Sequence, residues 1–163
     1  MTPVFFLVGF MGVGKTTVGR ALASRLGVPF YDVDARVEAE AGQTIRELFE
    51  SEGEPRFRIR EAKALRELGP LLGGGAVVAT GGGLFADPAN RHWIATRGRT
   101  VWLDAPFDLI LSRCQDDAAR PLFGDREEAR RLLEERRSGY EQADVRIPVD
   151  GRSVAEIVDL ILA

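Results

Sequence analysis

A glycine-rich loop near the start of the chain constrains the fold more than any other stretch. Residues 9–17, Gly-Phe-Met-Gly-Val-Gly-Lys-Thr-Thr, match the phosphate-loop pattern G-x-x-x-x-G-K-[ST] at every fixed position. An apolar run of strand length, Val4–Val8, precedes the loop, and apolar residues at helical spacing follow it from Thr17 to Leu26. This order directs backbone N–H groups and the positive end of a helix dipole at one spot. The stretch therefore predicts a site for phosphate groups.

Two side chains of the loop have the chemistry that a nucleotide requires. Lys15 would reach the outer phosphates, and the hydroxyl of Thr16 would be a ligand of magnesium. Lys15 is one of only two lysines in the chain, so its place in the loop does not reflect a lysine-rich composition. The alternative, a chance glycine turn before a helix, is disfavoured by the strand and the helix that flank the loop.

The composition excludes several classes of protein. A net charge of −3 argues against nucleic acid or an anionic membrane as a bulk partner. The single cysteine, Cys114, excludes an internal disulfide, and the single histidine, His92, excludes a histidine-rich metal site. The apolar run at the start is too short for a signal peptide or a membrane span. We expect a cytoplasmic protein, and a monomer, because nothing in the sequence demands assembly.

Segments with strand and helix patterns alternate along the chain. Strands are predicted at 4–8, 28–33, 76–80, 100–103 and 145–149. Helices are predicted at 17–26, 35–50 with an interruption near Gly42, 56–68, 107–114, 126–143 and 154–162, with a further helix after Asp87-Pro88. This alternation predicts an α/β fold of three layers, a five-stranded parallel sheet with helices on both faces. No linker or repeat divides the chain, so residues 1–163 are predicted to form a single domain.

Acidic residues and glycines lie where ligands bind in such a sheet. Asp32 and Asp34 follow the second predicted strand, and Gly81-Gly82-Gly83 follows the third, so all of them lie at the carboxyl edge with the phosphate loop. Asp32 would contact magnesium through water. Asp34 would lie on the same side of an extended chain and would orient an acceptor hydroxyl or take its proton. The alternative that both aspartates merely cap the next helix stays open.

Two arginines are candidates for binding anions. Arg58 lies on a predicted helix, and its planar guanidinium would suit a substrate carboxylate. Arg120 lies in the long polar loop between Gln115 and Asp125, and as part of a closing lid it would cover the phosphates. For each, a solvated surface arginine is the competing interpretation.

Several motifs together resemble the shikimate kinase family, and the likeness covers nearly the whole chain. They are Gly9–Leu22, Asp32-Val33-Asp34, Phe57-Arg58 with Glu61, Thr80–Gly83, Leu103–Pro106, Arg113 with Arg120-Pro121-Leu122, and Glu135-Arg136 with Tyr140. The resemblance implies the P-loop kinase fold and transfer of the γ-phosphoryl group of ATP to the 3-hydroxyl of shikimate. It also implies Mg²⁺ as a cofactor and a place in aromatic amino-acid biosynthesis.

The resemblance implies a role for each matched position. The catalytic residues would be Lys15, Asp34 and Arg120. The nucleotide would be held by Gly12, Val13, Gly14, Lys15, Thr16 and Thr17, with Arg113 and Arg152 at the adenine and Arg120 in a mobile lid at about 113–125. Shikimate would be held by Asp34, Arg58, Gly82 and Arg136, with a helical substrate-binding segment at about 34–60. Thr16, and Asp32 through water, would serve the metal.

One stretch departs from the family pattern. Family members usually have Arg-x-Pro-Leu-Tyr where this chain has Arg136-Arg137-Ser138-Gly139-Tyr140. The choice between Arg136 and Arg137 as the substrate ligand is therefore open, although counting back from Tyr140 favours Arg136.

Three other functions compete with this interpretation. A related P-loop kinase would act on gluconate or a nucleoside monophosphate, but those families lack the combination of Asp34, Arg58 and the triple glycine. A GTP-hydrolysing switch is disfavoured because the Asn-Lys-x-Asp signature is absent. A catalytically silent binding module is disfavoured because Lys15, Thr16, Asp34, Arg58 and Arg120 are all present.

Overall fold

Five parallel strands form the centre of the molecule. The computed structural model describes residues 2–114 and 125–163, and these residues form one sheet with strand order β2-β3-β1-β4-β5. The strands are β1 (Val4–Val8), β2 (Phe30–Asp32), β3 (Ala76–Ala79), β4 (Arg99–Asp104) and β5 (Val145–Pro148). Each neighbouring pair is parallel. The predicted five-stranded parallel sheet is confirmed.

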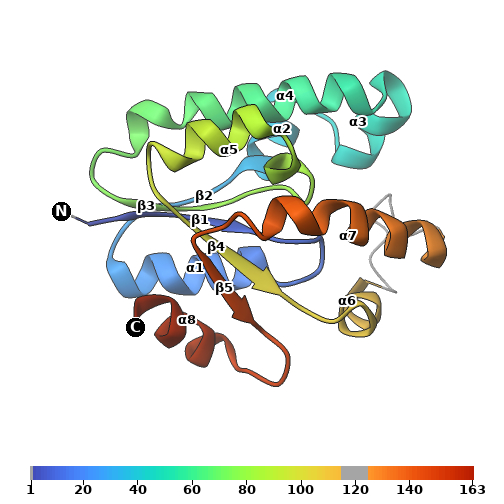
Figure 1. Ribbon diagram of the computed structural model, residues 1–163. Helices are drawn as coiled ribbons and strands as arrows, with labels where there is room; N and C mark the ends of the chain where they lie inside the picture. Colours follow the sequence, from blue (N-terminus) through green and yellow to red (C-terminus); the bar gives the residue numbers. More distant parts are fainter. Residues whose placement is uncertain (1, 115–124) are drawn as a thin grey trace.

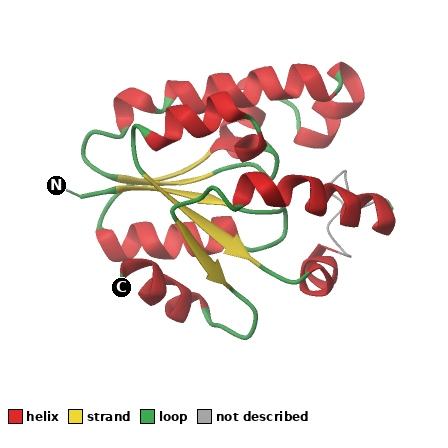
Figure 2. Ribbon diagram, viewed as in Figure 1, coloured by secondary structure: helices red, strands yellow, loops and turns green. Residues whose placement is uncertain are grey.

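Helices cover both faces of this sheet. They are α1 (Lys15–Leu26), α2 (Val33–Ala41), α3 (Ile45–Glu52), α4 (Glu54–Glu67), α5 (Pro88–Ala95), α6 (Phe107–Cys114), α7 (Arg126–Tyr140) and α8 (Val154–Leu162), with the short 3-10 helices η1 (Gly69–Leu71) and η2 (Leu84–Ala86). In Figure 1, α1 and α8 lie on one face and α4 and α5 on the other, and Figure 2 shows the sheet between these two helical layers. Among the described helices, none combines the length and the apolarity needed to cross a bilayer.

The central strands form the core because they carry almost no polar side chains. Every residue of β1 and of β3 is buried, as expected for parallel strands that are covered on both faces. Burial of this apolar surface is the main stabilising contribution to such a domain. The two central strands therefore provide a rigid base for the loops at their carboxyl ends.

The second strand is shorter than predicted, and this corrects the geometry proposed for Asp34. The extended run predicted at 28–33 ends at Asp32, and α2 begins at Val33. Asp32 Oδ1 accepts a hydrogen bond of 3.2 Å from the backbone N–H of Ala35, so Asp32 is the N-cap residue of α2. Asp34 thus lies in the first turn of a helix, and the prediction that it follows Asp32 along an extended chain is wrong.

Side chains cap the start of several helices. Thr44 and Glu47 form a capping box at the start of α3, and Ser153 caps α8 with Glu156 as its partner. Asp87 caps α5, and Pro88 occupies the first position of that helix. The helix predicted at 126–143 ends earlier, at Tyr140.

A crevice opens where connections leave the sheet in opposite directions. The loop after β1 leads to α1 on one face, and the segment after β3 leads through η2 to α5 on the other face (Figure 1). Ligands bind at such a switch point in open α/β sheets. The phosphate loop and the triple glycine form adjacent walls of this crevice.

Helix α1 packs close to the sheet at Gly19, which yields a stability prediction. A Cβ atom at Gly19 would overlap Cε1 of Phe30 and would lie 3.1 Å from Cδ1 of the same ring. Alanine favours a helix over glycine by about 1 kcal/mol, but overpacking costs about 1–3 kcal/mol. We expect Gly19→Ala to lower the free energy of unfolding by about 1 kcal/mol, measured by urea denaturation.

The control for this substitution is Gly73→Ala. Gly73 has open space around it, so alanine there should change the free energy of unfolding by less than about 0.5 kcal/mol. A stabilised Gly19→Ala variant would contradict the close packing of α1 on Phe30.

Candidate active site

The phosphate loop adopts a conformation that glycine favours. Gly9, Gly12 and Gly14 have φ angles of 146°, 85° and 100°, a region that residues with a side chain rarely adopt. A Cβ atom at Gly9 would also lie 2.6 Å from the carbonyl oxygen of Leu103. Gly14 is the N-cap residue of α1 and has no side chain to occupy the first-turn N–H groups. Those groups and the helix dipole provide an anion site at residues 12–17.

Two cations stabilise the loop through its carbonyl groups. Lys15 Nζ donates hydrogen bonds to the carbonyl oxygens of Gly9, at 2.5 Å, and Phe10, at 3.0 Å. Arg113, at the end of α6, donates from one Nη atom to the carbonyl oxygen of Val13, at 3.1 Å. Both positive charges therefore lie beside the anion site, where they favour the binding of phosphate.

The residues predicted to serve magnesium contact each other. Thr16 Oγ1 donates a hydrogen bond of 3.0 Å to Asp32 Oδ2. A hydroxyl and a carboxylate are hard oxygen ligands, which Mg²⁺ prefers. Within residues 2–114 and 125–163, no three His, Cys, Asp or Glu side chains cluster as a metal site. A pair of oxygen donors such as this suits a Mg²⁺ ion.

A cavity of about 340 Å³ extends from the phosphate loop towards α3 and α4. The predicted residues that line it are Gly12, Gly14, Lys15, Thr16, Thr17, Asp32, Asp34, Arg58, Gly82 and Arg136. The structure thus brings together residues from separate segments of the chain. Ile45, Phe49 and Phe57 contribute apolar surface to the wall that α3 and α4 form.

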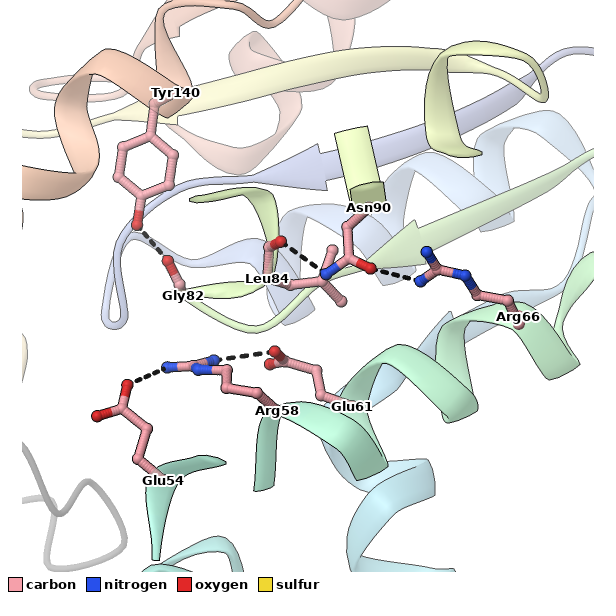
Figure 3. A network of polar contacts seen from close by, with 8 residues as sticks. All are labelled: Glu54, Arg58, Glu61, Arg66, Gly82, Leu84, Asn90 and Tyr140. Atoms are coloured by element: carbon pink, nitrogen blue, oxygen red, sulfur yellow. Dashed lines mark hydrogen bonds and ion pairs between the residues drawn. The ribbon is translucent and has the colours of Figure 1, made fainter. Parts of the chain in front are cut away.

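Acidic and basic side chains alternate on the α4 side of the cavity. Arg58 donates a hydrogen bond of 2.9 Å to Glu61 Oε1 and a longer one of 3.3 Å to Glu54 (Figure 3). Glu61 is only 1% exposed, and burial raises its pKa in spite of the nearby Arg58. Arg58 is therefore held by two carboxylates at the edge of the cavity.

The carboxylate of Asp34 lies deeper than the residue as a whole. The residue is partly exposed, but its Oδ1 atom is buried. Desolvation, followed by the charges of Glu61 and Asp32, raises the pKa of Asp34 to about 7, although Lys15 and Arg58 act in the opposite direction. A carboxylate with such a pKa suits the acceptance of a proton near neutral pH.

Three charged side chains hold buried atoms that lack a hydrogen-bond partner among the described residues. These atoms are Asp34 Oδ1, Glu61 Oε2 and one Nη atom of Arg136. Buried polar groups are nearly always satisfied, and exceptions point to a role such as binding a ligand. All three residues line the same cavity. The cavity therefore suits a ligand that offers both hydroxyl donors and an anionic acceptor.

The structure distinguishes Arg136 from Arg137. Arg136 is 6% exposed, lines the cavity and lies over the ring of Phe10, at 5.7 Å from its centroid. The side chain of Arg137 is 36% exposed and forms an ion pair with Glu134. Burial lowers the pKa of Arg136, so this guanidinium is the one with most to gain from a carboxylate partner.

The triple glycine is explained by side chains that approach its backbone. A Cβ atom at Gly81 would lie 2.5 Å from Glu61 Oε2 and 2.7 Å from Asp34 Oδ1. One at Gly82 would lie 3.2 Å from an Nη atom of Arg136, and one at Gly83 would overlap the Arg58 guanidinium. Glycine is needed here because charged side chains occupy the space of each missing side chain.

The remaining predicted residues lie elsewhere. Arg113 contacts the outer side of the phosphate loop, and Arg152 donates a hydrogen bond to the carbonyl oxygen of Pro148 after β5; neither lines the cavity. Val13 is buried beneath the loop. Arg120 and most of the predicted lid at 113–125 lie outside the described residues.

Glu61 is a central member of the site, although the sequence motifs indicate no role for it. Its spacing of three residues after Arg58 on a helix was the available signal, because such pairs share a helix face. That signal indicates an ion pair but not burial, since it would look the same on a solvated face. The close approach of its carboxylate to Gly81, in the segment after β3, accompanies the burial of Glu61.

The raised pKa of Asp34 yields a prediction about stability. A carboxyl whose pKa is higher in the folded than in the unfolded state binds its proton more tightly when folded, so the folding stability falls as pH rises from about 4 to about 7. An asparagine at this position cannot ionise and avoids this loss. We expect Asp34→Asn to become more stable than the parent between pH 5 and pH 8 by on the order of 2 kcal/mol, discounted for solvent screening.

Denaturation in urea across this pH range, with EDTA present, measures the effect. Asp150→Asn removes an exposed carboxylate and should change the free energy of unfolding by less than about 0.5 kcal/mol. If the difference in free energy of unfolding between Asp34→Asn and the parent does not change with pH, the Asp34 carboxylate of the folded parent is well solvated.

Comparison with known proteins identifies a family. The sequence model of the shikimate kinase family matches residues 11–163. The chain is 42% identical to the shikimate kinase of Persephonella marina over 158 residues, covering 96% of this chain and 95% of that protein. Among solved structures, shikimate kinase from Acinetobacter baumannii in complex with shikimate superposes with a TM-score of 0.93 at 39% identity, covering 99% of this chain and 92% of that one.

A second solved structure supports the same conclusion. Shikimate kinase from Aquifex aeolicus has a TM-score of 0.85 at 40% identity and covers 97% of this chain and 93% of its own. The family resemblance stated from the sequence motifs is confirmed. The chain belongs to the shikimate kinase family.

Proposed function

We propose that this protein transfers the γ-phosphoryl group of ATP to the 3-hydroxyl of shikimate, giving shikimate 3-phosphate and ADP. One observation carries the proposal: buried atoms of Asp34, Glu61 and Arg136, unpartnered among the described residues, belong to one cavity beside a phosphate loop. A cyclic acid with hydroxyl groups satisfies both the carboxylates and the guanidinium. The related protein from Acinetobacter baumannii is described in complex with shikimate, which is such an acid.

The donor half of the reaction uses the phosphate loop. The N–H groups at the start of α1 would bind the β- and γ-phosphates, and Lys15 would turn from its carbonyl partners to the outer phosphate oxygens. Thr16 directly, and Asp32 through water, would hold Mg²⁺. When bound, that ion neutralises the charge that develops on the phosphates.

The acceptor half uses the opposite side of the cavity. Arg136 would bind the carboxylate of shikimate, with Arg58 beside it, because charge-assisted bonds to a guanidinium are strong and directional. Asp34 would accept a hydrogen bond from the 3-hydroxyl. These contacts would hold the hydroxyl oxygen in line with the γ-phosphorus, and such alignment supplies much of the rate enhancement in phosphoryl transfer.

The chemical step itself is a substitution at phosphorus. The 3-oxygen forms a bond to the γ-phosphorus while the bond from that phosphorus to the β,γ-bridging oxygen breaks, and ADP leaves. The hydroxyl proton passes to Asp34, whose raised pKa favours its acceptance. Arg120 stays a prediction as the cation that covers the transferred group.

The proposal includes the organisation of the protein. Residues 1–163 would act as a single kinase domain, with about 34–60 as the helical substrate-binding segment and about 113–125 as a lid. A monomer would be the working unit. We place the activity in the cytoplasm, where ATP is available. The adenine ring of ATP would lie near Arg113 and Arg152.

A panel of acceptors tests the function. ADP formation is measured with Mg²⁺-ATP and, in turn, shikimate, gluconate and nucleoside monophosphates. We expect turnover with shikimate alone, and the product should carry phosphate on the 3-oxygen, which ³¹P and ¹H NMR identify. Turnover with gluconate or a nucleotide instead would identify a related kinase, and binding of both ligands without turnover would identify a silent module.

A substitution at Gly81 should separate the two halves of the site. A Cβ atom at this position would displace the carboxylates of Glu61 and Asp34, because the three atoms nearest to it all belong to these two side chains. We expect Gly81→Ala to lower kcat/KM for shikimate by about 100-fold or more, because misplaced catalytic groups cost on this scale. The affinity for ATP, measured by calorimetry, should change less than about twofold, since uncontacted sites are independent.

The matched control is Gly74→Ala, since a Cβ atom at Gly74 would have open space around it. That variant should keep the kinetic constants of the parent for both substrates. Full activity of Gly81→Ala would show that the two carboxylates tolerate displacement and have no positioning role.

A further inference from the structure

Tyr140 lies behind the site and carries a contact that the proposed reaction does not use. It is 1% exposed, belongs to the last turn of α7 and does not line the cavity. Its hydroxyl donates a hydrogen bond to the carbonyl oxygen of Gly82 (Figure 3). Its ring packs against Trp102, with centroids 5.8 Å apart. The side chain therefore joins α7 to the triple glycine.

The same turn of α7 carries the buried arginine of the cavity. Arg136 and Tyr140 are four residues apart, so they share one face of the helix. An Nη atom of Arg136 lies 3.2 Å from the position of a Cβ atom on Gly82, the residue whose carbonyl oxygen accepts from Tyr140. A shift of α7 relative to Gly82 would therefore move the guanidinium within the cavity.

The backbone beyond Gly82 is held from a different helix. Asn90 Nδ2 donates to the carbonyl oxygen of Leu84 at 3.0 Å, and Arg91 donates to those of Phe85 and Ala86 at 2.8 and 3.0 Å. Both donors belong to α5. The segment after β3 is thus fixed by α5 along η2, while its glycine end is held by the hydroxyl from α7.

The hydroxyl of Tyr140 remains a hydrogen-bond donor at neutral pH. Burial raises the pKa of Tyr140 to about 12. The positive charge of Arg136, a hydrogen bond with Arg136 and the charge of Arg58 only partly oppose this shift. The hydroxyl is therefore protonated at neutral pH, and a buried hydroxyl with this partner retains its hydrogen bond.

We propose that Tyr140 is a positioning residue for the acceptor: its bond to Gly82 fixes the last turn of α7 and thereby holds Arg136 where the acceptor carboxylate binds. The inference rests on the proposed function only for the identity of the acceptor. Tyr140 touches no reacting group, so its effect passes through Arg136.

A double-mutant cycle tests this coupling. Tyr140→Phe keeps the ring and removes the hydroxyl; we expect KM for the acceptor to rise about fivefold, the worth of one buried hydrogen bond, with kcat and KM for ATP within about twofold. Arg136→Lys should raise KM for the acceptor by about 10-fold or more, because lysine cannot replace the bidentate guanidinium. In the double variant the tyrosine change should add less than about twofold, because both act on one contact.

The control removes another buried hydroxyl. Thr100 is 4% exposed, and its hydroxyl bonds to Asp144 between β4 and the turn before β5, away from the cavity. Thr100→Val should lower the melting temperature while leaving KM for the acceptor within about twofold, and should combine additively with Arg136→Lys. A rise in KM for both substrates after Tyr140→Phe, or fully additive effects with Arg136→Lys, would overturn the proposal.

The test is independent of the shikimate assignment. The acceptor used is whichever compound of the panel the parent protein phosphorylates, so a different substrate changes only the assay. If none is phosphorylated, hydrogen exchange in the free protein decides: Tyr140→Phe should accelerate exchange of the amides at 81–84 by about fivefold, and Thr100→Val should not. Unchanged exchange at these amides would show that the hydrogen bond from Tyr140 to Gly82 does not hold this segment in place, and would refute the proposal.

Discussion

Charged atoms that are buried without a partner among the described residues dominate the energetics of this site. Asp34 Oδ1, Glu61 Oε2 and an Nη atom of Arg136 are desolvated beside one cavity, and each such group lowers the stability of the ligand-free protein. The protein tolerates this because the packed apolar strands β1 and β3 lie directly beneath. The site is thus preorganised for a ligand with complementary charge, and the stability of the sheet offsets the cost of that preorganisation.

The triple glycine makes room for these charged side chains. Each of the three residues leaves room for a different charged group, the Asp34 and Glu61 carboxylates at Gly81, Arg136 at Gly82 and Arg58 at Gly83. The segment is held in turn by side chains from α5 and α7 (Figure 3). Acceptor recognition therefore depends on a backbone that makes close approach possible, and on the helices that keep that backbone in place.

Local sequence signals predicted most elements of the fold, and their misses have physical causes. Apolar runs placed β1 and β3 because these strands are buried on both faces. Shorter apolar stretches bounded by turn residues placed the other strands. This pattern overextended the second strand through Val33, because Asp32 caps a helix by accepting from Ala35, and this capping ends the extended backbone. Glu61 received no role because spacing on a helix carries no information about burial. The lid and Arg120 were predicted from the polar loop at 115–125 and from the family resemblance, and they stay predictions.

The sequence by itself determined the phosphate loop, the alternation of strands and helices, and the family, because these depend on short spacings that a single chain displays directly. Only the tertiary structure decided that Arg136 rather than Arg137 enters the cavity, and that Asp34 and Glu61 meet at Gly81. Neighbouring arginines on a helix have identical local chemistry. They differ only in which face packs on the rest of the protein, and that packing brings together residues that lie far apart in the sequence.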